Sequence, residues 1–352
     1  MGKDIVLIRI GEFTNGVHRV ENELTEEWSK QGHQISTVLA NGRITFDSFG
    51  KIEIVEKEDE PKIKFIALAF RLFRLRKFFK EHKDATILAL SLPADCFAAI
   101  FGKTVKNRVV LSERNDPAQY PDSGRYRKFR DFCFRLADAC VFQTQDARSY
   151  FPESVQKKGV IIPNPINDKI PEFDRTNTEK IVMSTGRLKP QKNYPMLLRA
   201  FADFSQKYPD YALEIYGDGF QRQELEALAK ELGIRQKVRF MPFTTDIFPI
   251  MAKASMFVMS SNYEGISNSM LEAMAIGVPT ICTDCPVGGA RQMIEDGVNG
   301  LLVPVGDVKA LADAMCRVAG DRDLADSLGK NGHEIRNRYP IEIIARKWID
   351  VL

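Results

Sequence analysis

The feature that most constrains the fold is the repeated order of an apolar strand, a glycine-containing loop and an amphipathic helix. Residues 4–10, DIVLIRI, form a nearly continuous apolar run typical of a central parallel strand. After a polar turn at 11–16, apolar residues recur at helical spacing up to Gly32, and a second strand spans 34–40. This order opens a doubly wound α/β domain, in which ligands bind at the carboxyl ends of the strands. Because the loop lacks the GxGxxG pattern, an NAD site is not expected.

A second series of the same kind begins at 181–185, and further strands are predicted at 212–216, 237–241, 256–259, 279–283 and 300–304. The turn Pro163-Asn164-Pro165 and the polar stretch up to Lys180 are typical of an interdomain linker. A chain of 352 residues also exceeds what one hydrophobic core usually supports. We therefore expect a Rossmann-like N-terminal domain over 1–168, a second over 169–336, and a helical final segment over 337–352.

Composition narrows the classes of function. The net charge of +3 is too small to indicate nucleic-acid binding by itself. The six cysteines show no framework spacing, which favours reduced thiols in the cytoplasm, and the Cys282/Cys285 pair lacks the second pair of a metal site. The N-terminus leads directly into a strand without a signal-peptide pattern, and no run of eighteen apolar residues occurs.

The stretch 260–307 holds the strongest functional signal. Glu264 lies in a strand-to-helix loop, Gly265, Ile266 and Ser267 complete that loop, and a helix is predicted over 268–276. Backbone N–H groups at a helix start favour a phosphate. Two carboxylates, Glu264 and Glu272, would repel that phosphate, so we expect them to accept hydroxyls of a sugar and a ribose. The alternative is that they are ordinary solvated residues near a turn.

A second glycine loop follows the strand 181–185. Its sequence, 186–193, is GRLKPQKN, which places two cations, Arg187 and Lys192, five residues apart. The guanidinium fork of Arg187 and the point charge of Lys192 suit a pyrophosphate. The alternative interpretation is a basic surface turn.

These segments resemble the signature of the retaining GT-B glycosyltransferases of family 4, the E-x7-E group. Glu264 and Glu272 have its spacing, 186–193 is similar to its G-R-L…K-N motif, and the turn 162–165 matches its hinge. The resemblance implies an α/β protein of GT-B fold, with two Rossmann-like domains facing across a cleft. It further implies that the C-terminal domain holds a nucleotide sugar, that the N-terminal domain holds the acceptor, and that the final helix crosses back to the N-terminal domain.

The same resemblance assigns the site residues. It implies catalytic roles for Glu264, Arg187, Lys192 and the strand-end residues Glu113 and Arg114, although Arg114 stands where some members have His. It implies contacts with the donor from Gly16, Gly186, Arg187, Lys192, Gly217, Phe243, Glu264, Gly265, Ile266, Ser267, Asn268, Leu271 and Glu272. No metal or cofactor is expected, because Arg187 and Lys192 supply positive charge.

The implied reaction moves a hexose or N-acetylhexosamine from a nucleotide sugar to a hydroxyl of a glycan or lipid-linked acceptor, with retention, in surface-polysaccharide synthesis. UDP-sugars are favoured, but GDP and ADP stay open. Two alternatives remain, a non-catalytic nucleotide-sugar-binding subunit and a UDP-sugar epimerase of the same fold. Turnover of the donor distinguishes the first from the enzyme, and release of free UDP without an acceptor marks the second.

A basic, apolar helix is predicted between Lys62 and Lys83, with eight Lys or Arg against one Glu. Its residues Arg71, Arg74, Lys77 and Lys80 lie beside or opposite an apolar stripe. One interpretation is a crossover helix packed on the sheet with a solvated basic face. The other is peripheral contact with the inner face of the cell membrane.

Overall fold

The computed structural model describes residues 2–9, 16–39, 50–56, 64–167, 169–171 and 178–352. The chain divides into unit 1, Met1–Pro165 with Ile341–Leu352, and unit 2, Ile166–Pro340. The expected boundaries were at 168/169 and 336/337. The polar loop at 11–15, residues 62 and 63, and linker residues 168 and 172–177 lie outside the described residues. No helix among the described residues is long and apolar enough to cross a membrane.

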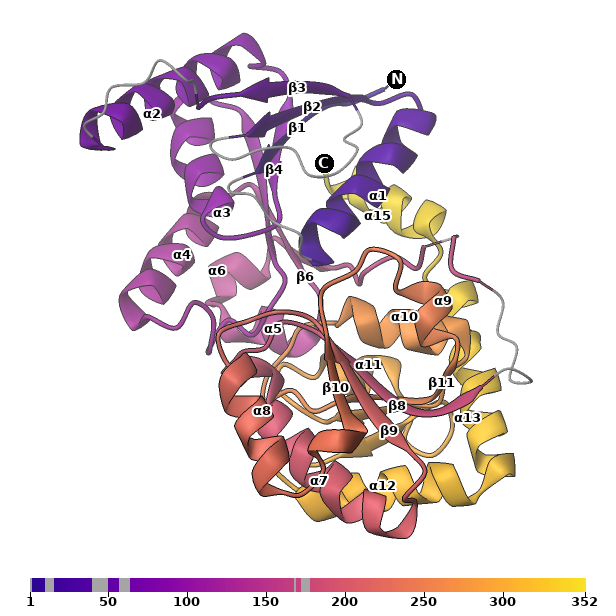
Figure 1. The fold of residues 1–352 in the computed structure, drawn as a ribbon. Helices are drawn as coiled ribbons and strands as arrows, with labels where there is room; N and C mark the ends of the chain where they lie inside the picture. Colours follow the sequence, from indigo (N-terminus) through magenta and orange to yellow (C-terminus); the bar gives the residue numbers. More distant parts are fainter. Residues whose placement is uncertain (1, 10–15, 40–49, 57–63, 168, 172–177) are drawn as a thin grey trace. The chain divides into compact units, whose positions relative to one another are not determined.

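Unit 1 contains a parallel sheet with the strand order β3-β2-β1-β4-β5-β6-β7 (Figure 1). Its strands are β1 (Asp4–Arg9), β2 (Gln34–Leu39), β3 (Lys51–Ile54), β4 (Thr86–Ala89), β5 (Arg108–Glu113), β6 (Ala139–Phe142) and β7 (Gly159–Ile161). The central strands are buried, as their continuous apolar runs predict. Strand β3 was not predicted, because this edge strand alternates basic, apolar and acidic residues and is largely exposed.

Helices cover both faces of this sheet. On one face, α1 (Gly16–Lys30) packs against α15 (Ile341–Val351), and Trp28 Nε1 donates to the Ala345 carbonyl at 3.0 Å. On the other face lie α2 (Lys64–Glu81), α3 (Ala94–Phe97), the π-helix η1 (Ala98–Gly102) and α4 (Gly124–Leu136) (Figure 1). Two short helices, α5 (Gln145–Tyr150) and α6 (Glu153–Gln156), precede β7.

Unit 2 contains a second parallel sheet, with the order β10-β9-β8-β11-β12-β13. Its strands are β8 (Glu179–Thr185), β9 (Ala212–Tyr216), β10 (Val238–Met241), β11 (Ala254–Met259), β12 (Thr280–Thr283) and β13 (Leu301–Val303). Its helices are η3 (Pro190–Lys192), α7 (Tyr194–Lys207), α8 (Arg222–Glu231), η4 (Arg235–Lys237), α9 (Phe248–Met251), α10 (Asn268–Ile276), α11 (Gly289–Met293), α12 (Val308–Gly320), α13 (Arg322–His333) and α14 (Ile335–Arg338).

Two apolar layers enclose the sheet of unit 2. One layer joins the sheet to α7, α8 and α12, and the other joins it to α9 and α10. The expected architecture of two doubly wound, parallel α/β domains is therefore confirmed. Helix α11 begins at Gly289, and Gly288 directly before it has a φ of 76°, a conformation that favours glycine.

Candidate functional site

The site predicted in unit 2 lies where the strand order of the sheet reverses. From β8 the chain continues outward to β9 and β10, and then it crosses to β11 on the other side of β8. The loops that follow β8 and β11 therefore leave neighbouring strands at the same edge of the sheet. In open α/β sheets, ligands bind at such a switch point. The loops are 186–193 and 260–267, the two segments with the strongest functional signal.

Backbone and side-chain hydrogen bonds join these two loops. The Asn262 amide donates to the Gln191 carbonyl at 2.8 Å, and Gln191 Nε2 donates to the Tyr263 carbonyl at 3.1 Å. The Asn262 side chain donates to the Pro190 carbonyl at 2.9 Å and accepts from Asn193 Nδ2 at 2.9 Å. Asn193 has a φ of 48°, a left-handed conformation that asparagine adopts more readily than most residues. We call this set of contacts the Asn262 clamp.

The clamp brings Lys192 and Glu264 into direct contact. Lys192 Nζ lies 2.6 Å from Glu264 Oε2, and the two side chains are only 14% and 16% exposed. Ser261 Oγ is a further, weaker donor to the same oxygen at 3.5 Å. Charge-assisted hydrogen bonds of this length are stronger than neutral ones. The two charges that the sequence assigned to different parts of a ligand thus form one ion pair.

The loop that follows β12 holds the backbone around Glu264. The Glu264 amide donates to the Pro286 carbonyl at 2.7 Å, and the Val287 amide donates to the Glu264 carbonyl at 3.1 Å. A Cβ on Gly289 would lie 2.0 Å from the Gly265 carbonyl oxygen, so this position requires glycine. The loop after β12 therefore fixes the height of Glu264 above the sheet.

Glycines also permit the close approach of the loop 186–193 to the segment that follows β9. A Cβ on Gly217 would lie 2.1 Å from the Gly186 carbonyl oxygen, and its φ is 144°. From inside the unit, Tyr194 Oη donates to the same Gly186 carbonyl at 3.1 Å. Burial raises the pKa of the Tyr194 phenol, so this hydroxyl stays a donor at neutral pH.

Helix α10 begins directly after the Glu264 loop. Ser267 is its N-cap residue, and the helix spans the predicted Asn268–Ile276. Leu271 and Ile266 are buried in the apolar layer beneath, and Glu272 is 7% exposed in the second helical turn. The first turn of α10 thus directs backbone amides toward the loop that holds Glu264.

Two further candidates in unit 2, Arg187 and Phe243, are exposed. Arg187 is exposed, one residue after Gly186. Phe243 follows β10 and is 49% exposed, while its backbone amide donates to Asp218 Oδ2 at 3.1 Å. The described residues contain no group of three or more His, Cys, Asp or Glu side chains able to hold a metal ion.

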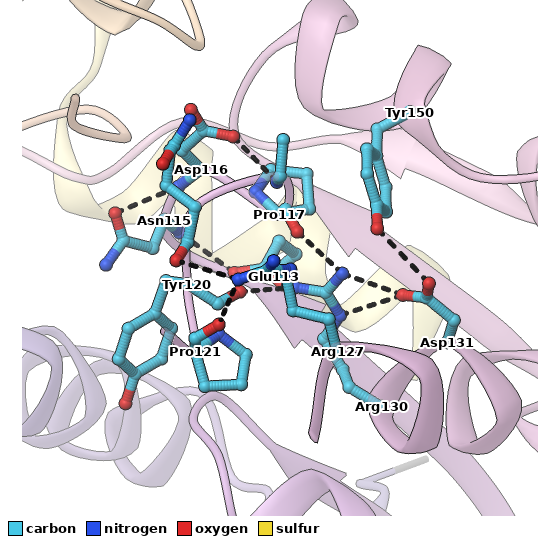
Figure 2. Close-up of polar contacts among 12 residues, drawn as sticks. Glu113, Asn115, Asp116, Pro117, Tyr120, Pro121, Arg127, Arg130, Asp131 and Tyr150 are labelled. Atoms are coloured by element: carbon cyan, nitrogen blue, oxygen red, sulfur yellow. Dashed lines mark hydrogen bonds and ion pairs between the residues drawn. The ribbon is translucent and has the colours of Figure 1, made fainter. Parts of the chain in front are cut away.

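Three candidates lie in unit 1. The first, Glu113, contacts the loop that follows it and Arg130. Figure 2 shows Glu113 at the end of β5, with Oε2 3.2 Å from Arg130 Nη1 and Oε1 accepting from the Asn115 amide at 3.0 Å. Burial raises the pKa of Glu113 to about 7, although the charge of Arg130 opposes this rise. These contacts are those of a residue that positions the loop 113–121.

Arg130, which was not predicted as a site residue, organises that loop. Its guanidinium is fully buried and donates to the carbonyls of Tyr120 at 2.6 Å and Pro117 at 2.8 Å, and also to Asp131 (Figure 2). A basic helix with five Lys or Arg gives no sequence signal for which one is buried. Only the packing of α4 on the sheet distinguishes it.

The other two candidates in unit 1 have different surroundings. The Arg114 side chain donates to Asn164 and lies over the Trp348 ring, with Cζ 5.9 Å from the ring centre. Burial lowers the pKa of Arg114 to about 10, so it remains a cation at neutral pH. Gly16 is exposed at the start of α1.

Comparison with known proteins agrees with this geometry. Residues 166–335, nearly all of unit 2, match the family model described as "Glycosyl transferases group 1". The whole chain is 25% identical to an uncharacterized glycosyltransferase of Haemophilus influenzae, with 98% of each chain covered. It is 28% identical, over 83% of each chain, to a Campylobacter jejuni N-acetylgalactosamine-N,N'-diacetylbacillosaminyl-diphospho-undecaprenol 4-alpha-N-acetylgalactosaminyltransferase.

Solved structures show the same fold. The Anabaena protein Alr3699/HepE in complex with UDP-glucose superposes with a TM-score of 0.85 at 18% identity, over 99% of this chain and 98% of that one. A structure of the protein TarM has a TM-score of 0.82 at 15% identity, with 99% of this chain and 98% of that one covered. The chain therefore has the GT-B fold, and its residues 166–335 are similar to the group 1 glycosyltransferase domain.

Proposed function

We propose that this protein is a retaining glycosyltransferase that moves a hexose or N-acetylhexosamine from a UDP-sugar to a hydroxyl of a glycan or lipid-linked acceptor. The observation that carries the proposal is the Lys192–Glu264 ion pair between the loops after β8 and β11. The names of the relatives support the substrate class, because one transfers N-acetylgalactosamine to an undecaprenol-linked glycan and a structural neighbour holds UDP-glucose. Surface-polysaccharide synthesis is the proposed setting.

In this proposal the donor diphosphate binds between Arg187, Lys192 and the start of α10. Arg187 is exposed and long enough to form a bidentate contact, while Lys192 contributes a single, mostly buried charge. The amides at 265–267 add partial positive charge from the helix dipole. These cations meet the charge that develops on the departing diphosphate, so the proposed reaction has no separate metal or cofactor.

The carboxylates hold the neutral parts of the donor. Glu264 accepts hydroxyls of the transferred sugar. Glu272, in the second turn of α10, accepts those of the ribose. When the diphosphate arrives, Lys192 is shared between a phosphate oxygen and Glu264. That sharing links the position of the sugar to the position of the leaving group.

The transfer step breaks the bond between the sugar's anomeric carbon and the diphosphate oxygen. The acceptor oxygen bonds to the same face of that carbon, and its proton passes to the departing phosphate. Atoms and charge balance, because UDP leaves with the acceptor proton. Retention follows from the shared face of departure and attack.

The acceptor is assigned to unit 1, with peripheral membrane contact through the helix at 62–83. Two of the cations proposed for that contact have partners in the protein: Arg71 pairs with Glu56, and Arg74 Nη1 donates to the Val55 carbonyl at 2.9 Å. The other two predicted cations, Lys77 and Lys80, are exposed, and so is Arg76. A membrane contact of α2 therefore uses Arg76, Lys77 and Lys80.

Calorimetric titration with UDP, GDP and ADP tests the donor site. We expect selective binding of UDP that weakens roughly tenfold or more in Arg187→Ala and in Lys192→Ala, because each loses a charged hydrogen bond of about 1.5–3 kcal/mol. Arg199→Ala, an exposed arginine on α7, is the matched control and should bind UDP normally. A panel of UDP-sugars, followed for slow hydrolysis, then identifies the sugar. Absence of binding by all three nucleotides to folded protein would reject the proposal.

Asn262→Ala tests whether the clamp positions the ion pair. The variant loses two side-chain hydrogen bonds of roughly 1 kcal/mol each, so we expect kcat/KM for the donor to fall about tenfold. The decrease should fall mainly on kcat, since Lys192 and Glu264 remain present but lose their fixed separation. Asn331→Ala removes a similar amide-to-carbonyl bond, to Val298 at 2.9 Å, and serves as control. An equal kcat in both variants would show that the clamp has no positioning role.

A further inference from the structure

Large exposed aromatic side chains gather on two helices of unit 1. On α2, Phe70 is 48% and Phe73 is 68% exposed. On α4, the exposed fractions are 68% for Tyr126, 44% for Phe129 and 50% for Phe132. Single exposed apolar residues are ordinary, but a group of aromatic rings on adjoining elements marks a binding surface.

The two helices lie on the same face of the sheet. The connections from β3 to β4, from β4 to β5 and from β5 to β6 all advance in one direction across the sheet, and right-handed crossovers then place their helices on one side. The π-helix η1 packs against both α2 and α4. Figure 1 shows α2, α3 and α4 along this side of the sheet of unit 1. We call the outer surface of α2 and α4 the α2/α4 face.

The α2/α4 face is strongly basic. Together the two helices contain eleven Lys or Arg residues and two acidic residues. Both acidic residues are engaged, since Glu81 lies 3.7 Å from Lys77 and Asp131 accepts from buried Arg130. The exposed cations among the aromatic rings are Arg76, Lys77, Lys80, Arg125, Lys128 and Arg135.

The inner side of α4 prevents its outer rings from turning inward. Cys133 and Phe134 are fully buried, and Arg130 is fixed by the carbonyls of Pro117 and Tyr120 and by Glu113. Rotating the helix to bury Phe129 or Phe132 would break these hydrogen bonds and leave a buried charge unpaired. The exposed aromatic residues are therefore a fixed property of the folded unit.

We propose that the α2/α4 face docks on an anionic phospholipid bilayer. Aromatic side chains favour the membrane–water interface, and Lys and Arg attract anionic headgroups. Exposed rings and exposed cations occur together on both helices, which suits a planar partner of continuous negative charge. This inference deepens the proposed function, on which it rests for the lipid-linked acceptor, and it adds α4 to the membrane contact.

Sedimentation with liposomes tests the docking, using full-length protein. Vesicles of phosphatidylcholine with about one third phosphatidylglycerol are compared with vesicles of phosphatidylcholine alone. We expect the parent protein to sediment with the anionic vesicles only. Arg125→Glu/Lys128→Glu on α4 and Arg76→Glu/Lys80→Glu on α2 should each weaken the partition roughly thirtyfold or more, because each cation near such a surface contributes about 1 kcal/mol. Phe129→Ser/Phe132→Ser should weaken it with the charge unchanged.

The control is Lys230→Glu/Lys330→Glu, which makes the same charge change on two exposed lysines of unit 2 and should sediment like the parent. Unchanged sedimentation of the α4 charge variant would overturn the inclusion of α4. Absence of parent sedimentation with anionic vesicles would overturn the lipid partner and point to an acidic protein. Calorimetry with UDP on every variant keeps this test separate, because docking can fail while UDP binding and the proposed function stand.

Discussion

Glu264→Gln is expected to lower the rate of sugar transfer by about a hundredfold or more while UDP affinity changes less than tenfold. The substitution keeps the size of the side chain but removes the charge that Lys192 contacts at 2.6 Å. Preorganised charges at a reacting centre contribute effects of this order, because the low-dielectric surroundings strengthen them. Glu264 is placed on the sugar in our proposal, so the uridine and ribose contacts remain intact.

The experiment measures kcat and KM for the UDP-sugar together with the Kd for UDP. Glu295→Gln, an exposed carboxylate of the same unit, is the control and should behave like the parent. A Kd for UDP that weakens as much as kcat falls would mean that Glu264 supports the nucleotide through Lys192. Turnover within a few-fold of the parent would remove Glu264 from the sugar subsite.

The two loops of unit 2 were predictable from sequence because their signals are local. In each loop a buried strand, a glycine and the start of a helix predict that Arg187 or Glu264 lies between strand and helix. The structure has α10 at the predicted residues. Their direct pairing was not predictable. Lys192 and Glu264 are 72 positions apart, and they meet only because β8 and β11 are neighbours in the sheet and Asn262 bonds to the opposite loop.

Unit 1 was harder to interpret for the same reason. Glu113 was predicted as a strand-end carboxylate, but its partner Arg130 lies on a helix whose five cations the sequence does not distinguish. Likewise, helical periodicity identified the basic character of α2 but placed Arg71 among its surface charges, whereas this residue pairs with Glu56. Periodicity gives the face of a helix, and only packing shows which charges on it have partners.

The Arg130–Glu113 pair leads to the second large expected effect, on stability. Arg130→Met should lower the free energy of unfolding of unit 1 by about 3–5 kcal/mol at pH 8, because it leaves a buried carboxylate unpaired. Both tryptophans of the chain, Trp28 and Trp348, are buried in unit 1, so their fluorescence during urea unfolding reports on this unit.

The loss should depend on pH with a definite sign. The pKa of Glu113 is raised to about 7 in the folded protein from an ordinary value of 4.5, so the folded state binds the proton more tightly than the unfolded state. Stability from this group is therefore complete below about pH 4.5 and is lost as the pH rises through 7. In Arg130→Met the carboxyl loses its cation and its pKa rises further. The variant should accordingly lose less at pH 5, where Glu113 is protonated, than at pH 8.

Two comparisons separate this pair from the rest of the helix. Arg127→Met removes hydrogen bonds to the Pro121 and Asp122 carbonyls from the same helix but unpairs no carboxylate, so its smaller loss should be the same at both pH values. The double variant Arg130→Met/Glu113→Gln should regain part of the stability at pH 8 and lose the pH dependence. Equal losses at pH 5 and pH 8 for Arg130→Met would show that the arginine acts through the carbonyls of Pro117 and Tyr120 alone, and that the charge of Glu113 has no part in holding the loop.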